Sequence, residues 1–129
     1  MSRTLLLIDD DDDIREIAQL SLELGAGWTV LTAASGTEGI EVARDKQPDA
    51  ILLDVMMPTL DGPATLAKLR EDERTVRIPV VFLTAKARPS ERDRLAGLDV
   101  AGVLAKPFDP MTLADQLRSA LGWPSGDAT

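Results

Sequence analysis

Short apolar runs alternate with longer amphipathic segments along the chain, which is the pattern of an α/β protein. Four of the five apolar runs are continuously apolar, as expected for parallel strands buried on both faces of a sheet. The second run contains threonines, so we expect it at an edge of the sheet. The predicted strands are Thr4–Ile8, Trp28–Ala33, Ala50–Asp54, Pro79–Thr84 and Gly102–Ala105.

Residues that favour helix starts and helix ends lie between the predicted strands. The first helix has an apolar stripe of Ile14, Ile17, Ala18 and Leu24 and ends at Gly25. Ser35 and Glu38 cap the second helix, which runs to about Lys46. Asp61 or Gly62 starts the third helix, just before Pro63. Ser90 caps the fourth helix, which ends near Gly97. The fifth helix starts at Asp109 and Pro110, turns Met111, Leu113, Leu117 and Leu121 inward, and ends at Gly122.

Five strands, each followed by a helix, predict a three-layer, doubly wound α/β domain around a five-stranded parallel sheet. The 129 residues of the chain suit a single domain. We assign residues 1–123 to this domain and residues 124–129 to a short C-terminal tail, and we interpret the ending as that of a stand-alone protein. Ligands of such folds bind beyond the carboxyl ends of the strands, so functional residues are expected at that edge.

The composition narrows the classes of function. The chain has no cysteine and no histidine, which excludes disulfides, thiol catalysis and His-ligated metal sites. Its 22 acidic residues outnumber its 14 Lys and Arg, and the net charge of −8 would be repelled by nucleic acid and by anionic lipid. The first apolar run is too short for a signal peptide or a membrane span. We therefore expect a cytoplasmic protein that binds neither membrane nor nucleic acid directly.

The ends of the predicted strands carry residues that are able to do chemistry, namely Asp9, Asp10, Asp54, Thr84 and Lys106. In a parallel sheet these strand ends all emerge at one edge. Two carboxylates about 4 Å apart repel each other by roughly 4 kcal/mol at an effective dielectric near 20. Three carboxylates would therefore raise their pKa values or recruit a cation. Because neither Cys nor His is present, Mg²⁺ is the cation that suits the set best.

Such a set suits the transfer of a phosphoryl group to a carboxylate. A nucleophilic aspartate would form an acyl phosphate, a cation would screen the two anions, and Lys106 and Thr84 would hold the phosphoryl oxygens. Each residue alone has an ordinary structural explanation, and we interpret Asp11, Asp12 and Asp13 as the acidic start of a helix. It is the occurrence of all five groups at one edge that favours a functional site.

Four segments occur in an order and with gaps that resemble a known family: LLLIDDDDDIRE, AILLDVMMPTLDG, VVFLTAKA and GVLAKPFDP. From Leu5 to about Trp123, the chain resembles the receiver domain of bacterial two-component response regulators, including the stand-alone chemotaxis regulator. The resemblance implies a flavodoxin-like fold with strand order 2-1-3-4-5. It also implies a phosphorelay switch rather than a metabolic enzyme. Its phosphodonor would be a sensor histidine kinase or a histidine phosphotransfer protein, and its target a downstream effector protein.

The resemblance also implies roles for single residues. Asp54 looks like the phosphoacceptor, while Thr84 and Lys106 look like the groups that bind the phosphoryl group and assist its transfer and slow hydrolysis. Mg²⁺ would be held by Asp10 and Asp54 directly, by Asp9 through or beside the metal, and by the carbonyl of Met56. In the family the bond from this lysine to Pro107 is cis, Ala85 is suitably small, and Met56 and Lys86 occupy positions that tune the lifetime of the phosphoryl group.

Two positions depart from the family pattern. Val103 stands where well-studied members have an aromatic residue, and Pro63 stands where a bulky apolar residue is more common. A valine cannot bury the area of an aromatic ring as the domain switches. We therefore expect the change on phosphorylation to concentrate in residues 84–95, with a smaller population shift in the fourth helix.

Two other functions remain open at this point. A haloacid-dehalogenase-like phosphatase also uses an aspartyl phosphate, Mg²⁺, a threonine and a lysine, and the run Asp9–Asp13 meets its Asp-x-Asp spacing, but Asp54 would then have no role. Turnover of a generic phosphate ester would favour that enzyme. A degenerate receiver would bind partners without taking phosphate, although such members typically lose an acid, the threonine or the lysine. Failure to label with a small phosphodonor and Mg²⁺ would favour it.

Overall fold

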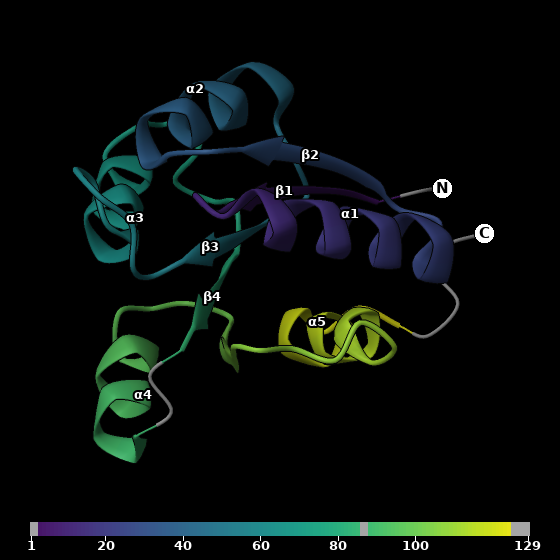
Figure 1. Ribbon diagram of the computed structural model, residues 1–129. Coiled ribbons are helices and arrows are strands. Elements are labelled where there is room, and N and C mark those ends of the chain that lie inside the picture. Colours follow the sequence, from purple (N-terminus) through teal and green to yellow (C-terminus); the bar gives the residue numbers. More distant parts are fainter. Residues whose placement is uncertain (1–2, 86–87, 125–129) are drawn as a thin grey trace.

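The computed structural model describes residues 3–85 and 88–124, in which five strands and five helices alternate (Figure 1). The strands are β1 (Thr4–Ile8), β2 (Thr29–Ala33), β3 (Ala50–Asp54), β4 (Val80–Thr84) and β5 (Gly102–Ala105). The helices are α1 (Asp12–Ala26), α2 (Gly36–Lys46), α3 (Gly62–Arg70), α4 (Pro89–Ala96) and α5 (Leu113–Leu121). All strand pairings are parallel in the order β2-β1-β3-β4-β5, which confirms the predicted fold and places β2 at an edge.

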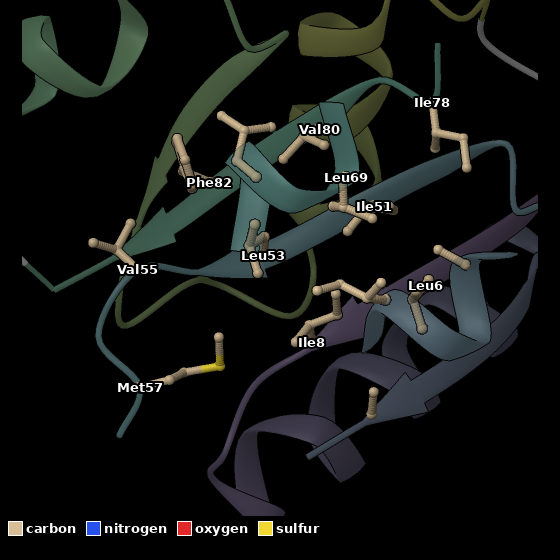
Figure 2. Close-up of a cluster of buried hydrophobic side chains, with 14 of the residues drawn as sticks. Leu6, Ile8, Ile51, Leu53, Val55, Met57, Leu69, Ile78, Val80 and Phe82 are labelled. Carbon is tan, nitrogen blue, oxygen red and sulfur yellow. The ribbon is translucent and has the colours of Figure 1, made fainter. Parts of the chain in front are cut away.

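Helices cover both faces of the sheet, as the continuously apolar strands require. Helices α1 and α5 lie together on one face, while α2, α3 and α4 lie on the other (Figure 1). Strands β3 and β4 are buried at every position. In the core under α2–α4, Leu69 lies beside Ile51 and Val80, in one buried cluster that also contains Phe82, Leu6 and Ile8 (Figure 2). The buried, paired middle strands therefore set where the strand ends lie.

The predicted caps of α2 and α3 are confirmed. The Ser35 hydroxyl accepts a hydrogen bond from the N–H of Glu38 at 3.1 Å, and the Glu38 carboxylate accepts one from the N–H of Ala34 at 2.6 Å. The Asp61 carboxylate accepts from the N–H of Ala64 at 2.9 Å. These bonds satisfy N–H groups that the first turn of a helix leaves without partners.

Helix α1 differs from the prediction at its end and on its buried face. It continues past Gly25 to Ala26, and Gly27 ends it with a left-handed φ of 73°. Its buried residues are Ala18, Leu22 and Ala26, which are four residues apart. Leu24, predicted to face inward, is 84% exposed.

The starts of α4 and α5 also differ from the prediction. Arg88 rather than Ser90 occupies the N-cap of α4, because Pro89 is well suited to the first turn. Helix α5 begins at Leu113, since Asp109 instead closes a preceding turn by accepting from the N–H of Met111 at 2.8 Å. Met111, predicted to face inward, is 88% exposed and lines a groove of about 490 Å³ with residues of α1.

Aromatic rings and guanidinium groups contact one another at the amino ends of the strands. The Trp28 and Trp123 rings meet edge to face with centroids 5.3 Å apart. The Arg3 guanidinium lies 4.4 Å from the Trp123 ring centroid, and the Arg118 guanidinium 5.3 Å from that of Trp28. Among the described residues, no helix is both long and apolar enough to cross a lipid bilayer.

Candidate functional site

Strand register brings two acids together at the carboxyl edge of the sheet. Ile8 of β1 pairs with Leu53 of β3, so the residues that follow them, Asp9 and Asp54, are neighbours across the two central strands. Adjacent strands lie about 4.8 Å apart. Asp9 is fully buried and Asp54 is 2% exposed, whereas Asp10 is exposed. The chain therefore buries two carboxylates side by side.

Lys106 provides the positive charge between them. Its Nζ lies 2.8 Å from Asp9 Oδ2 and 3.3 Å from Asp54 Oδ1. Its main-chain N–H donates to the carbonyl of Thr84 at 2.8 Å, which ties the end of β5 to the end of β4. The bond from Lys106 to Pro107 is cis, as predicted.

Thr84 and Met56 border the same cluster. Thr84 is buried at the end of β4, one residue beyond Leu83, which pairs with Asp54. The N–H of Met56 donates to Asp54 Oδ1 at 3.4 Å, and its side chain is exposed. Gly62 also approaches closely, because a Cβ there would lie 2.6 Å from the carbonyl oxygen of Asp54.

The remaining acids of the first loop start helix α1, as predicted. Asp11 is the N-cap and accepts from the N–H groups of Asp13 and Ile14. Its own N–H donates to Asp9 Oδ1 at 2.9 Å. Arg15, which the sequence analysis did not select, donates to the carbonyl of Asp9 at 2.7 Å. Its place in the first motif was visible, but nothing in the sequence shows where a guanidinium on α1 points.

The cluster of Asp9, Asp54 and Lys106 carries more negative than positive charge. Burial and, after it, the negative charge of Asp9 raise the pKa of Asp54, Lys106 offsets only part of both effects, and the net result is a pKa of about 6. Burial alone would lower the pKa of Lys106, but contacts with Asp9 and Asp54 outweigh it, so the net shift is upward. Lys106 therefore stays protonated, and the buried pair of carboxylates keeps an excess of negative charge.

The donor set suits a hard divalent cation. Asp9, Asp10 and Asp54 each offer a carboxylate oxygen, and these atoms all lie within 4.8 Å of one another. Asp9 Oδ2 is buried and pairs with the Lys106 ammonium at 2.8 Å, but that ammonium also pairs with Asp54. One positive charge does not neutralise two carboxylates, so the set keeps negative charge that a cation would balance. Oxygen donors alone favour Mg²⁺ over softer metals.

The structure thus brings together most of the residues selected from the sequence. Asp9, Asp54 and Lys106 are in contact, and Asp10 lies within reach of the same cation. Thr84 is joined to them through the main chain of Lys106. Lys86 lies outside the described residues.

Comparison with known proteins gives the family. Residues 5–118 match the response regulator receiver domain. The chain is 37% identical over 123 residues to the phosphate regulon transcriptional regulatory protein PhoB of Pseudomonas aeruginosa, covering 94% of this chain and 52% of that protein. It is 40% identical over 119 residues to the DNA-binding dual master transcriptional regulator RpaA of Synechocystis, covering 91% and 48% respectively. The chain spans about half the length of these curated relatives.

Solved structures agree with this family. The chemotaxis response regulator CheY4 of Vibrio cholerae has a TM-score of 0.85 at 30% identity, covering 93% of this chain and 99% of that one. The receiver domain of the Pseudomonas aeruginosa sensor histidine kinase PA1611, which holds a magnesium ion in its active site cleft, has a TM-score of 0.81 at 29% identity, covering 95% and 99%. The chain therefore belongs to the response regulator receiver domain family of two-component systems.

Proposed function

We propose that this domain is a phosphorylation-activated switch in which Asp54 accepts a phosphoryl group from a sensor histidine kinase or a histidine phosphotransfer protein. The observation that carries the proposal is the contact cluster of Asp54, Asp9 and Lys106 at the carboxyl edge. Asp54 ends the middle strand of the sheet and keeps a charge that its surroundings only partly neutralise. Membership of the receiver family supports the same function.

In the proposed transfer, a carboxylate oxygen of Asp54 attacks phosphorus. The new oxygen–phosphorus bond forms as the phosphorus–nitrogen bond of a phosphohistidine breaks, and the leaving imidazole keeps the electron pair of that bond. Mg²⁺ bound by Asp9, Asp10, Asp54 and the Met56 carbonyl would screen the approach of two anions. Lys106 would stabilise an equatorial phosphoryl oxygen by its charge, and the Thr84 hydroxyl would donate to another.

The same groups would link the modification to a partner surface. Drawing Thr84 toward the phosphoryl group would move the end of β4 and the loop that leads to α4, which a downstream effector protein would read. Slow hydrolysis of the acyl phosphate would reset the switch. We propose residues 1–123 as the receiver domain and residues 124–129 as a tail. We also propose that this portion does not itself bind nucleic acid, because its net charge is −8, although RpaA is named as DNA-binding.

Covalent labelling tests the proposal. Incubation with acetyl phosphate and Mg²⁺ should add one phosphoryl group by intact mass, and Asp54→Asn should abolish the addition. Asp115→Asn removes an exposed acid from α5 and should label like the parent. Full labelling of Asp54→Asn would rule out Asp54 as the acceptor. No labelling of the parent would indicate a degenerate receiver, and turnover of a generic phosphate ester would indicate a phosphatase.

A further inference from the structure

We propose that Arg15 is a positioning residue for the metal-binding acids, and that it acts by fixing the main chain of Asp9. This inference rests on the proposed function, because it concerns the same Mg²⁺ site. Arg15 is the fourth residue of α1 and its side chain is only 18% exposed. It touches neither Asp54 nor Lys106 through any of the described hydrogen bonds or ion pairs, so its effect on the site would pass through the first loop.

The guanidinium of Arg15 spans that loop from one end to the other. Its Nη1 donates to the carbonyl oxygen of Asp9 at 2.7 Å, while its Nη2 pairs with the carboxylate of Asp12. Asp9 is the residue that follows β1, and Asp12 is the first residue of α1. One planar group therefore holds both ends of the segment that contains Asp10, the exposed member of the acid cluster.

The bond from Arg15 completes a full set of restraints on Asp9. The N–H of Asp9 donates to the carbonyl of Ala33 at 3.1 Å, and its Oδ1 accepts from the N–H of Asp11 at 2.9 Å. Arg15 occupies the carbonyl, and Oδ2 is the oxygen that pairs with Lys106 at 2.8 Å. The restraints on the other three atoms thus fix the direction of the carboxylate that Asp9 contributes to the acid cluster.

Because Arg15 is positively charged, a positioning role and a purely electrostatic role predict opposite changes in Mg²⁺ affinity when Arg15 is removed. A guanidinium near a divalent cation repels it, so a purely electrostatic role predicts that removing Arg15 would tighten Mg²⁺ binding. A positioning role predicts the reverse, because the acids would lose their fixed geometry. Groups that orient metal ligands typically change metal affinity by about 10–100-fold when they are replaced.

Lysine separates charge from geometry at this position. Arg15→Lys keeps the positive charge and can still donate to the Asp9 carbonyl, but it lacks the planar fork that also holds Asp12. Arg118 supplies the matched control. It pairs with Asp115 three residues before it on α5, and its side chain is 14% exposed, close to the value for Arg15.

The experiment measures Mg²⁺ affinity by isothermal titration calorimetry for the parent, Arg15→Ala, Arg15→Lys and Arg118→Ala. We expect Arg15→Ala to bind at least about tenfold more weakly, Arg15→Lys about threefold or more, and Arg118→Ala like the parent. In chelator, the amide resonance of Asp11, whose N–H donates to Asp9, should shift in Arg15→Ala but not in Arg118→Ala.

Affinity in Arg15→Ala that equals or exceeds that of the parent would overturn the inference. If Arg15→Ala does not fold, Arg15→Lys decides: weaker Mg²⁺ binding with a folded spectrum supports positioning, and parental affinity overturns it. A loss of affinity in Arg118→Ala equal to that in Arg15→Ala would also overturn it, since the effect would then be general. Absence of Mg²⁺ binding by the parent would instead contradict the proposed function.

Discussion

The amino and carboxyl edges of the sheet use charged side chains in different ways. At the amino edge, Arg3 and Arg118 lie against the rings of Trp123 and Trp28, and the Asp49 carboxylate accepts from the N–H of Thr4 at 2.7 Å. At the carboxyl edge, Asp9 and Asp54 are buried together with one ammonium group between them. The amino edge is arranged for stability, and the carboxyl edge keeps negative charge that Lys106 balances only in part and that a cation would balance further. The residues that stabilise the fold and the residues proposed to carry the chemistry therefore lie at opposite ends of the same strands.

The largest effect is expected from Trp28→Ala at the amino edge. Trp28 is buried and packs against Trp123, so truncation should lower the free energy of unfolding by about 3–5 kcal/mol. Urea unfolding would measure it. Trp123→Ala is the control and should cost less, because that ring is only partly buried. Equal losses would mean that the ring contact, rather than burial, dominates the closure of this edge.

At the carboxyl edge, a substitution is expected to raise the free energy of unfolding rather than lower it. Asp54→Asn should stabilise the protein in chelator at pH 7, because it removes a charge whose pKa rises from 3.8 to about 6 in the fold. A shift of this size corresponds to on the order of 3 kcal/mol, at about 1.4 kcal/mol per unit of pKa. Urea unfolding in chelator would compare the variant with the parent. A variant less stable than the parent would show that Asp54 is not held at an electrostatic cost.

The pH dependence of that gain follows from linkage. The raised pKa means that the folded state binds the proton of Asp54 more tightly than the unfolded state, so this group destabilises the parent as pH rises from about 4 to about 6. The stability difference between Asp54→Asn and the parent should therefore be near zero below pH 4 and complete above pH 6. Melting curves in chelator at pH 4, 5, 6 and 7 would check it, and a constant difference would contradict it.

The sequence predicted the sheet well because burial on both faces leaves a direct trace in β1, β3 and β4. It also predicted the caps of α2 and α3, whose hydrogen bonds are local. It placed the end of α1 at Gly25 because a glycine there and one at Gly27 give the same signal. Only the packing of Ala26 and Trp28 against the core distinguishes them.

The sequence indicated which residues lie at the candidate site, but it did not indicate how they are arranged there. A run of five aspartates does not reveal which carboxylate is buried, and the structure buries Asp9 and exposes Asp10. The contact of Lys106 with both buried acids follows from the register of four strands, β1, β3, β4 and β5, which a sequence does not state. Arg15 was missed for a different reason, because its partner is the main-chain carbonyl of Asp9, which no pattern of side chains reveals.

A smaller gain is expected in the loop after β3. Thr59 adopts a left-handed φ of 68°, which is unfavourable for a β-branched residue. Thr59→Asn should therefore raise the free energy of unfolding by about 0.5–1 kcal/mol, because asparagine tolerates this conformation better. Thermal melts would measure the change. A loss of stability would mean that contacts of the Thr59 side chain outweigh the strain.

The smallest effect is the change expected around Val103 when the domain is phosphorylated. Val103 is half-buried, and its carbonyl accepts from Arg92 of α4 at 2.9 Å, which ties α4 to β5. We expect a beryllofluoride phosphoryl mimic to change amide NMR shifts most within residues 84–95 and less around Val103. Equally large shifts at Val103 and through α5 would show that another core residue replaces the missing aromatic ring.

In the proposed function, the carboxyl edge of the sheet carries the chemistry at Asp54. Reduction of the phosphorylated protein with borohydride converts an aspartyl phosphate into homoserine, and peptide mass spectrometry then locates the converted residue. We expect homoserine at position 54 only, with no conversion in samples treated in chelator. Conversion at Asp10 or at another acid of the first loop, with position 54 unchanged, would contradict it.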